Sequence, residues 1–128
     1  MEFALTEAQM MVQDMARNFA EKEIVPFVEE DEENHDYCRE ILTKIGELGL
    51  LGWSIPEEYG GNGMGWMEGI IALNEIVKVH ISLRLSINGN CWDPAMTINE
   101  WGQKNRSKYI PDIVSGKAVG SFALTFMQ

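Results

Sequence analysis

Apolar residues recur at helical spacing through most of this 128-residue sequence, and that spacing constrains its fold more than any other feature. In the first stretch, the apolar side chains between Ala8 and Phe19 fall mostly three or four residues apart and share one face of a helix. Thr6 precedes them and Gln9 follows it three residues later, which is the pattern of a capping box. We therefore expect an amphipathic α-helix that begins just after Thr6.

The same spacing predicts further helices along the chain. Gly49 and Gly102 stand where two of them should stop, and Pro26 is expected to kink or end the first helix. The fold class that this pattern indicates is all-α, a helical bundle. The further helices are expected at about Tyr37–Leu48, Trp66–Val79, Ser82–Trp101 and Lys104–Ile113.

Three segments depart from the helical pattern. The acidic run 29–33 repels itself and is expected to form a solvated helix end or loop. Glycines within 53–65 predict a structured loop. From Ala118 to Phe126 the helical spacing is lost, and one terminal β-strand is expected. Because a lone strand is marginal without partners, this strand implies a sheet outside the present polypeptide.

Composition narrows the possible partners. A chain of 128 residues with 45% hydrophobic content fits one domain with one core. Its formal charge of -10 repels phosphate backbones and anionic lipids, which argues against nucleic acid and membrane surfaces as partners.

No targeting peptide or membrane-spanning run is visible in the sequence. Cys38 and Cys91 fit no CxxC spacing and are expected to be inert thiols. We expect a soluble cytoplasmic protein.

Two motifs could be functional sites or ordinary structural features. Glu32 and His35 have the ExxH spacing of di-iron ligands, but the motif occurs once and His80 lacks a glutamate three residues before it, which favours a surface histidine. The glycine-rich stretch 60–65 does not have the GxGxxG spacing of a phosphate site, which favours a tight turn. No metal site is expected.

Several stretches, taken in order along the chain, resemble the acyl-CoA dehydrogenase family. The resemblance breaks after Thr125, where the family continues with Glu-Pro and this sequence reads Phe126-Met127-Gln128. Up to that point it spans nearly the whole chain. The matching stretches are Phe19–Pro26, Gly46–Gly52, Ile55–Gly61, Trp101-Gly102 with Lys108–Pro111, and Phe122–Thr125.

The resemblance implies a division of the chain and of the chemistry. Residues 1–117 are expected to form the family's N-terminal helical domain, and residues 118–128 the first strand of a truncated middle β-domain. A complete member holds FAD, α,β-desaturates an acyl-CoA thioester, uses electron-transfer flavoprotein as its electron acceptor and forms a homo-oligomer. The base, a glutamate, belongs to a C-terminal part outside this sequence. We therefore expect no catalytic residue here, no activity of this chain alone, and weak or absent FAD binding by it.

The resemblance also implies two sets of site residues. Phe122, Leu124 and Thr125 match the region that contacts the flavin, and the alternative is that they are core residues of an edge strand. Arg84, Asn88 and Cys91 are the expected substrate-binding residues, because their spacing places them on one face of the fourth helix together with Ala95 and Ile98.

Arg84 falls where the glutaryl-CoA branch of the family, which this chain resembles most, carries an arginine for the distal carboxylate of the substrate. Benzylsuccinyl-CoA dehydrogenases are similar. A planar guanidinium can bind both carboxylate oxygens and stays charged at any working pH. The alternative is an internal ion pair with one of the abundant acidic side chains.

The sequence thus predicts the N-terminal part of an FAD-dependent acyl-CoA dehydrogenase. This part is expected to form one wall of the acyl pocket and the first flavin contacts, with a dicarboxylic acyl-CoA such as glutaryl-CoA as the substrate. The alternative is a non-catalytic helical interaction module derived from that family. A metal-binding bundle is a third hypothesis, which bound iron or zinc would support.

Overall fold

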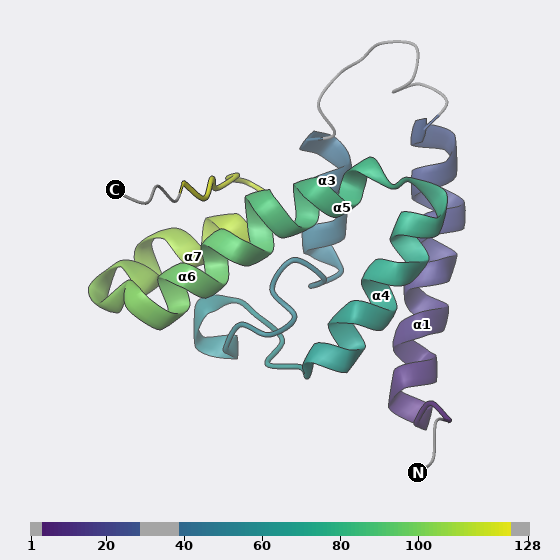
Figure 1. The fold of residues 1–128 in the computed structure, drawn as a ribbon, viewed down its shortest axis with the longest axis horizontal. Coiled ribbons are helices and arrows are strands. Elements are labelled where there is room, and N and C mark those ends of the chain that lie inside the picture. The colour runs from purple at the N-terminus through teal and green to yellow at the C-terminus, as the bar shows by residue number, and fades with distance from the viewer. Residues whose placement is uncertain (1–3, 29–38, 124–128) are drawn as a thin grey trace, which may run out of the picture.

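The computed structural model describes residues 4–28 and 39–123, and all the regular elements in those two ranges are helices, which confirms the all-α fold. In Figure 1, α1 packs beside α4, and a long helix made of α5, η3 and α6 crosses the molecule with α7 next to α6. The longer elements are α1 (Glu7–Phe19), α3 (Arg39–Glu47), α4 (Trp66–Val79), α5 (Ser82–Ile87), α6 (Asp93–Trp101) and α7 (Arg106–Val114). The short ones are η1 (Ala20–Ile24), η2 (Glu57–Tyr59), η3 (Asn88–Trp92) and η4 (Gln103–Asn105).

The first helix begins as the sequence predicts. Thr6 Oγ1 accepts a hydrogen bond from the Gln9 amide at 3.2 Å, and Gln9 Oε1 accepts one from the Thr6 amide at 3.1 Å, which closes the capping box. Pro26 does not end the helix, which continues through residue 28. The disturbance takes the form of the π-helical turn η1 just before the proline, where the Val25 amide donates to the Ala20 carbonyl.

Helix α3 is the described part of the helix predicted for Tyr37–Leu48. It ends before Gly49, whose φ of 75° is the left-handed conformation expected of a glycine stop. The acidic run, Glu32, His35 and Cys38 lie outside the described residues.

The glycine-rich segment between α3 and α4 is a structured loop, as predicted. Asn62 holds it closed, because its Nδ2 donates to the Gly49 carbonyl at 3.1 Å and its amide donates to the Gly52 carbonyl at 2.9 Å. Gly60, with φ of 86°, ends the 3-10 turn η2. These bonds fix the loop beneath the long helix.

The predicted helix over 82–101 forms with a π-helical turn, η3, in its middle. Pro94 explains the turn, because it lacks an N–H and its ring would clash with the carbonyl of Asn90 in a regular α-helix. Pro94 also has no N–H to donate to that carbonyl. The Asn90 carbonyl instead accepts a hydrogen bond from the Gly120 amide at 2.7 Å.

The strand predicted from Ala118 is not formed within residues 118–123. A strand needs a neighbouring strand to bond its backbone, and among the described residues none is present. The segment bonds to helices instead, with the Ala118 amide donating to the Asp112 carbonyl at 2.9 Å. Leu124, Thr125 and the rest of the expected strand lie outside the described residues.

The buried Trp53 contacts two other indole rings, those of the exposed Trp66 and the buried Trp92. Trp53, in the loop, is 1% exposed and meets Trp66 and Trp92 edge-on, with ring centroids 4.6 and 4.9 Å away. The Trp92 Nε1 donates to the Leu50 carbonyl at 3.0 Å. Gly69 faces Trp53 so closely that a Cβ there would overlap the indole. The rings therefore join the loop, α4 and η3.

A buried carboxylate joins α1 to α4. Glu75 is 4% exposed and accepts hydrogen bonds from Gln13 Nε2 at 2.9 Å, Arg17 Nε at 3.3 Å and Lys78 Nζ at 2.8 Å. Burial alone would raise the pKa of Glu75, but the bonds from these three donors lower its pKa below the ordinary carboxyl value.

We expect Glu75→Gln to lower the free energy of unfolding by about 1–2 kcal/mol at pH 7, because a neutral amide loses the charge-assisted bonds. Arg17 and Lys78 are half-exposed, which keeps the loss moderate. A lowered folded-state pKa adds stability above the ordinary carboxyl pKa and loses it as pH falls through the folded value. Urea unfolding at a series of pH values from 7 to 3 should show that the difference in free energy of unfolding between Glu75→Gln and the unaltered chain becomes smaller. The exposed Glu58→Gln is the control, and a Glu75 effect independent of pH would contradict this cause.

Candidate functional site

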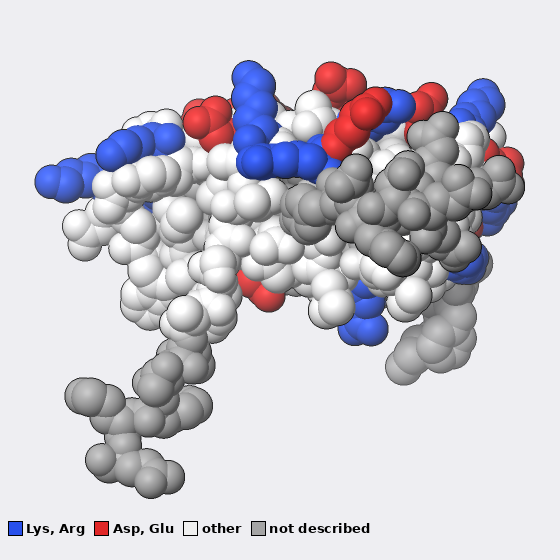
Figure 2. All heavy atoms as spheres, turned by 90° about the horizontal axis from the view of Figure 1, so that it is seen from above, with Lys and Arg blue, Asp and Glu red and all other residues white. Residues whose placement is uncertain are grey.

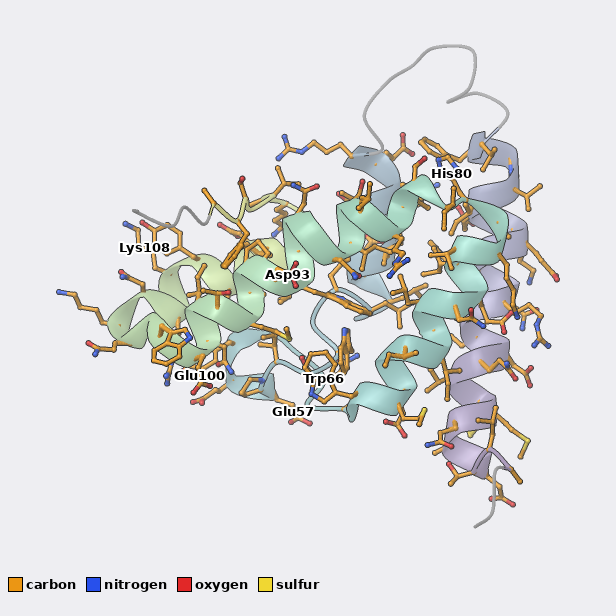
Figure 3. All side chains as sticks on the ribbon, viewed as in Figure 1. Glu57, Trp66, His80, Asp93, Glu100 and Lys108 are labelled. Atoms are coloured by element: carbon orange, nitrogen blue, oxygen red, sulfur yellow. The ribbon has the colours of Figure 1, made fainter. Side chains whose placement is uncertain are left out.

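A mostly apolar hollow of about 540 Å³ lies between α4 and the long helix. We call it the interhelical hollow. Figure 3 shows Trp66 on α4 and Asp93 on the long helix, the two elements that form its sides. The apolar side chains that line it include Trp66, Ile70, Val77, Ile81, Trp92 and Met96. A hollow of this size and character can hold an alkyl chain.

Arg84 is the cationic side chain among the described residues that line the interhelical hollow. The alternative predicted for it, an internal ion pair, is not formed within the described part of the chain. Asp93 lines the same hollow but lies nine residues further along the long helix, which is roughly 13 Å at the rise of a helix. The Arg84 guanidinium is therefore exposed and available to an anion.

Asn88 stands next to Arg84 on the face of the long helix that lines the interhelical hollow. Its Oδ1 is buried and has no hydrogen-bond partner among the described residues. The structure therefore brings together two of the three predicted substrate-binding residues. Together with Asp93 and Asn74 they are the polar residues of a hollow whose other lining residues are apolar.

Cys91 lies apart from Arg84 and Asn88. A shared face assumes a regular α-helix, but Cys91 lies inside the wider π turn η3. After Asn88, the face that lines the interhelical hollow continues with Trp92 and Met96 instead.

The Cys91 thiol is buried in the core. Cys91 and Ala95 are both 0% exposed and continue the buried face begun by Leu83 and Ile87. Burial raises the pKa of Cys91 to about 11, so the group stays a neutral thiol at physiological pH. The sequence expectation of an inert buried cysteine agrees with this environment.

The α4 wall of the interhelical hollow is absent from the predicted site residues. Trp66, Ile70 and Val77 recur at the spacing of one helical face, and that spacing is indistinguishable from a core face in sequence. Ala72 and Ile76 form a second, buried face of α4. The sequence did carry a signal for this wall, because α4 is apolar on two faces. A single core can cover only one of these faces, so the other must line a second contact or a hollow.

Phe122 is 55% exposed, in a segment where Ser121 and Ala123 are exposed as well. Leu124 and Thr125, the other two predicted flavin contacts, lie outside the described residues. The flavin contact predicted for these three residues stays a prediction.

The surface carries both signs of charge. In Figure 2 the Lys and Arg side chains are interspersed with Asp and Glu on the face shown, without a continuous basic strip there. Within residues 4–28 and 39–123, the structure contains no cluster of His, Cys, Asp and Glu suited to a metal ion. No helix in those ranges has the length and apolar character required to cross a bilayer.

Comparison with known proteins gives consistent matches. The family model described as "Acyl-CoA dehydrogenase, N-terminal domain" matches residues 6–117. The glutaryl-CoA dehydrogenase of Desulfococcus multivorans is 40% identical, over 98% of this chain and 33% of that protein. A solved glutaryl-coenzyme A dehydrogenase in complex with glutaryl-CoA is 39% identical with a TM-score of 0.86, over 94% of this chain and 31% of that one.

A second solved structure, described as the electron transferring flavoprotein of Acidaminococcus fermentans, contains a chain that is 38% identical with a TM-score of 0.84. That match covers 93% of this chain and 32% of the other. The present chain therefore spans about a third of the length of the relatives it matches.

Proposed function

Because this chain belongs to the acyl-CoA dehydrogenase family and corresponds to its N-terminal domain, we propose that it forms one wall of the acyl pocket in an FAD-dependent acyl-CoA dehydrogenase. In the complete protein it also makes the first contacts to the flavin. Residues 1–117 are the helical domain, and residues 118–128 open the middle β-domain. The partners that go with this function are electron-transfer flavoprotein and further copies of the same protein.

The observation that carries the proposal is the interhelical hollow, a mostly apolar surface with one guanidinium that forms no ion pair with the described residues. Ile70, Val77 and Ile81 suit the methylene groups of an acyl chain, because burying them removes apolar surface from water. Arg84 suits a carboxylate at the distal end of that chain, since its fork can hold both oxygens. We therefore propose a dicarboxylic acyl-CoA, such as glutaryl-CoA, as the substrate.

The chain's own residues bind and orient in this proposal, and they perform no proton transfer. Bound FAD supplies the acceptor for the hydride that leaves the β-carbon of the thioester. The Arg84 contact would hold the acyl chain by its far end and so position its reacting carbons. The apolar wall excludes water from the acyl chain.

We expect the 128-residue chain alone to show no dehydrogenase activity, with or without added FAD, because it lacks the base. Residues 1–125 joined to the remaining two thirds of the Desulfococcus multivorans enzyme should retain FAD and oxidise glutaryl-CoA with an artificial electron acceptor. Dye reduction measures the dehydrogenase activity of the 128-residue chain and of the chimera. The unaltered relative is the positive control.

Two outcomes would contradict the proposal. Dye reduction by the 128-residue chain alone would show that the chemistry resides in it. A folded chimera that neither retains FAD nor oxidises an acyl-CoA would favour the alternative function, a non-catalytic helical interaction module.

A further inference from the structure

Asn90 and Gly120 exchange two hydrogen bonds across a gap of 30 residues in sequence. The Gly120 amide donates to the Asn90 carbonyl at 2.7 Å, and Asn90 Nδ2 donates to the Gly120 carbonyl at 2.9 Å. One partner lies in the middle of η3, and the other lies in the segment that leaves α7. Both backbone groups of Gly120 are thus bonded to a single residue of the long helix. Such a pair fixes the direction of the chain as well as its position.

Pro94 makes this contact possible. Pro94 has no N–H to donate to the Asn90 carbonyl, and its ring lies beside that carbonyl. Gly120 lies against that ring, and a Cβ at this position would meet Pro94 Cγ at 2.5 Å. A residue with a side chain could not approach closely enough to form both hydrogen bonds.

The bonds to Gly120 are the last of a series that tethers the segment after α7. Arg39 Nη2 donates to the Lys117 carbonyl at 3.2 Å, and the Ala118 amide donates to the backbone carbonyl of Asp112 at 2.9 Å. Beyond Gly120, residues 121–123 are exposed. The pair at Gly120 therefore sets the angle at which the chain leaves the helical domain.

We propose that Asn90 is a positioning residue for the flavin. By clamping Gly120 it aims Phe122, two residues later, at the edge of the flavin ring system. This role rests on the proposed function, because it needs the flavin to lie beside Phe122. Asn90 itself acts through Gly120 and touches neither flavin nor substrate.

The clamp is tested first in the 128-residue chain by amide hydrogen exchange. Asn90→Ala removes the Nδ2 bond to the Gly120 carbonyl and keeps the backbone bond to the Gly120 amide. The segment should then open more often, and the Gly120 amide should exchange about tenfold faster, the effect of losing one hydrogen bond of typical strength. Asn90→Asp should do the same, since a carboxylate cannot donate to the Gly120 carbonyl. Asn99→Ala, another partly buried amide on the long helix, is the matched control and should leave that exchange unchanged. Unchanged exchange in Asn90→Ala would overturn the clamp.

The positioning role is tested in the chimera by flavin binding and absorption. Asn90→Ala and Asn90→Asp should weaken FAD binding about tenfold and shift the visible flavin bands, whereas Asn99→Ala should do neither. Unchanged affinity and bands in both Asn90 variants would overturn the positioning role while the proposed function stands. A parent chimera that retains no FAD would overturn the proposed function and this role with it, and the exchange experiment would still decide whether the clamp exists.

Discussion

Replacing Trp53 by alanine should lower the free energy of unfolding by about 3–5 kcal/mol, the range for truncating a fully buried tryptophan. The indole is 1% exposed and holds Trp66 and Trp92 by edge-on contacts, so its removal leaves a cavity between the loop, α4 and the long helix. Gly69, which has no side chain, cannot fill that cavity. A loss of this size approaches the whole stability of an ordinary domain.

Urea unfolding followed by circular dichroism measures the effect of Trp53→Ala. Trp101→Ala is the control, because Trp101 is 77% exposed and its loss should cost less than about 0.5 kcal/mol. Trp53→Phe should recover part of the stability by refilling the cavity. Equal small losses for Trp53→Ala and Trp101→Ala would show that the indole cluster does not organise the core.

Replacing Arg84 by alanine should weaken the use of glutaryl-CoA by about 1.5–3 kcal/mol in kcat/KM, which is about 10- to 150-fold. Butyryl-CoA, which has no distal carboxylate, should be oxidised almost as before. The expectation follows from the position of Arg84 in the interhelical hollow without an ion pair among the described residues. Kinetics of the chimera with both substrates measure the difference.

Arg84→Lys is the matched control for charge. A lysine keeps the positive charge but binds as a point charge, so it should recover only part of the preference for glutaryl-CoA. If Arg84→Ala impairs both substrates equally, Arg84 has a structural role and the dicarboxylic substrate is wrong. An Arg84→Ala variant that keeps full preference for glutaryl-CoA would contradict the assignment as well.

The substrate and cofactor residues were predictable to different degrees. Arg84 and Asn88 lie within one turn of each other and share the wall of the interhelical hollow, as helical spacing predicts, and their role in substrate binding stays a prediction. Cys91 lies inside the π turn η3 and is buried on the core face with Ile87 instead of lining the hollow. Trp92 takes the place on the hollow that spacing gave to Cys91. Of the predicted flavin contacts, Phe122 is exposed, Leu124 and Thr125 lie outside the described residues, and the contact of all three with the flavin stays a prediction.

The features that the sequence determined by itself depend on neighbouring residues. The capping box at Thr6, the glycine stop at Gly49 and the bounds of α4 each follow from bonds, torsion angles or side-chain periodicity within a few residues. Such local preferences act in any context that leaves the helix intact. This is why the all-α fold could be stated before any contact between helices was known.

The tertiary structure alone decided the features that join distant residues. The Asn90 carbonyl, to which Pro94 can donate no N–H, accepts from the Gly120 amide 30 residues away, and residues 118–123 form no strand because their partners here are helices. The interhelical hollow exists because α4 turns only one of its two apolar faces to the core. The spacing of apolar residues shows which faces of a helix are apolar. Which of these faces is buried depends on the elements that pack against the helix.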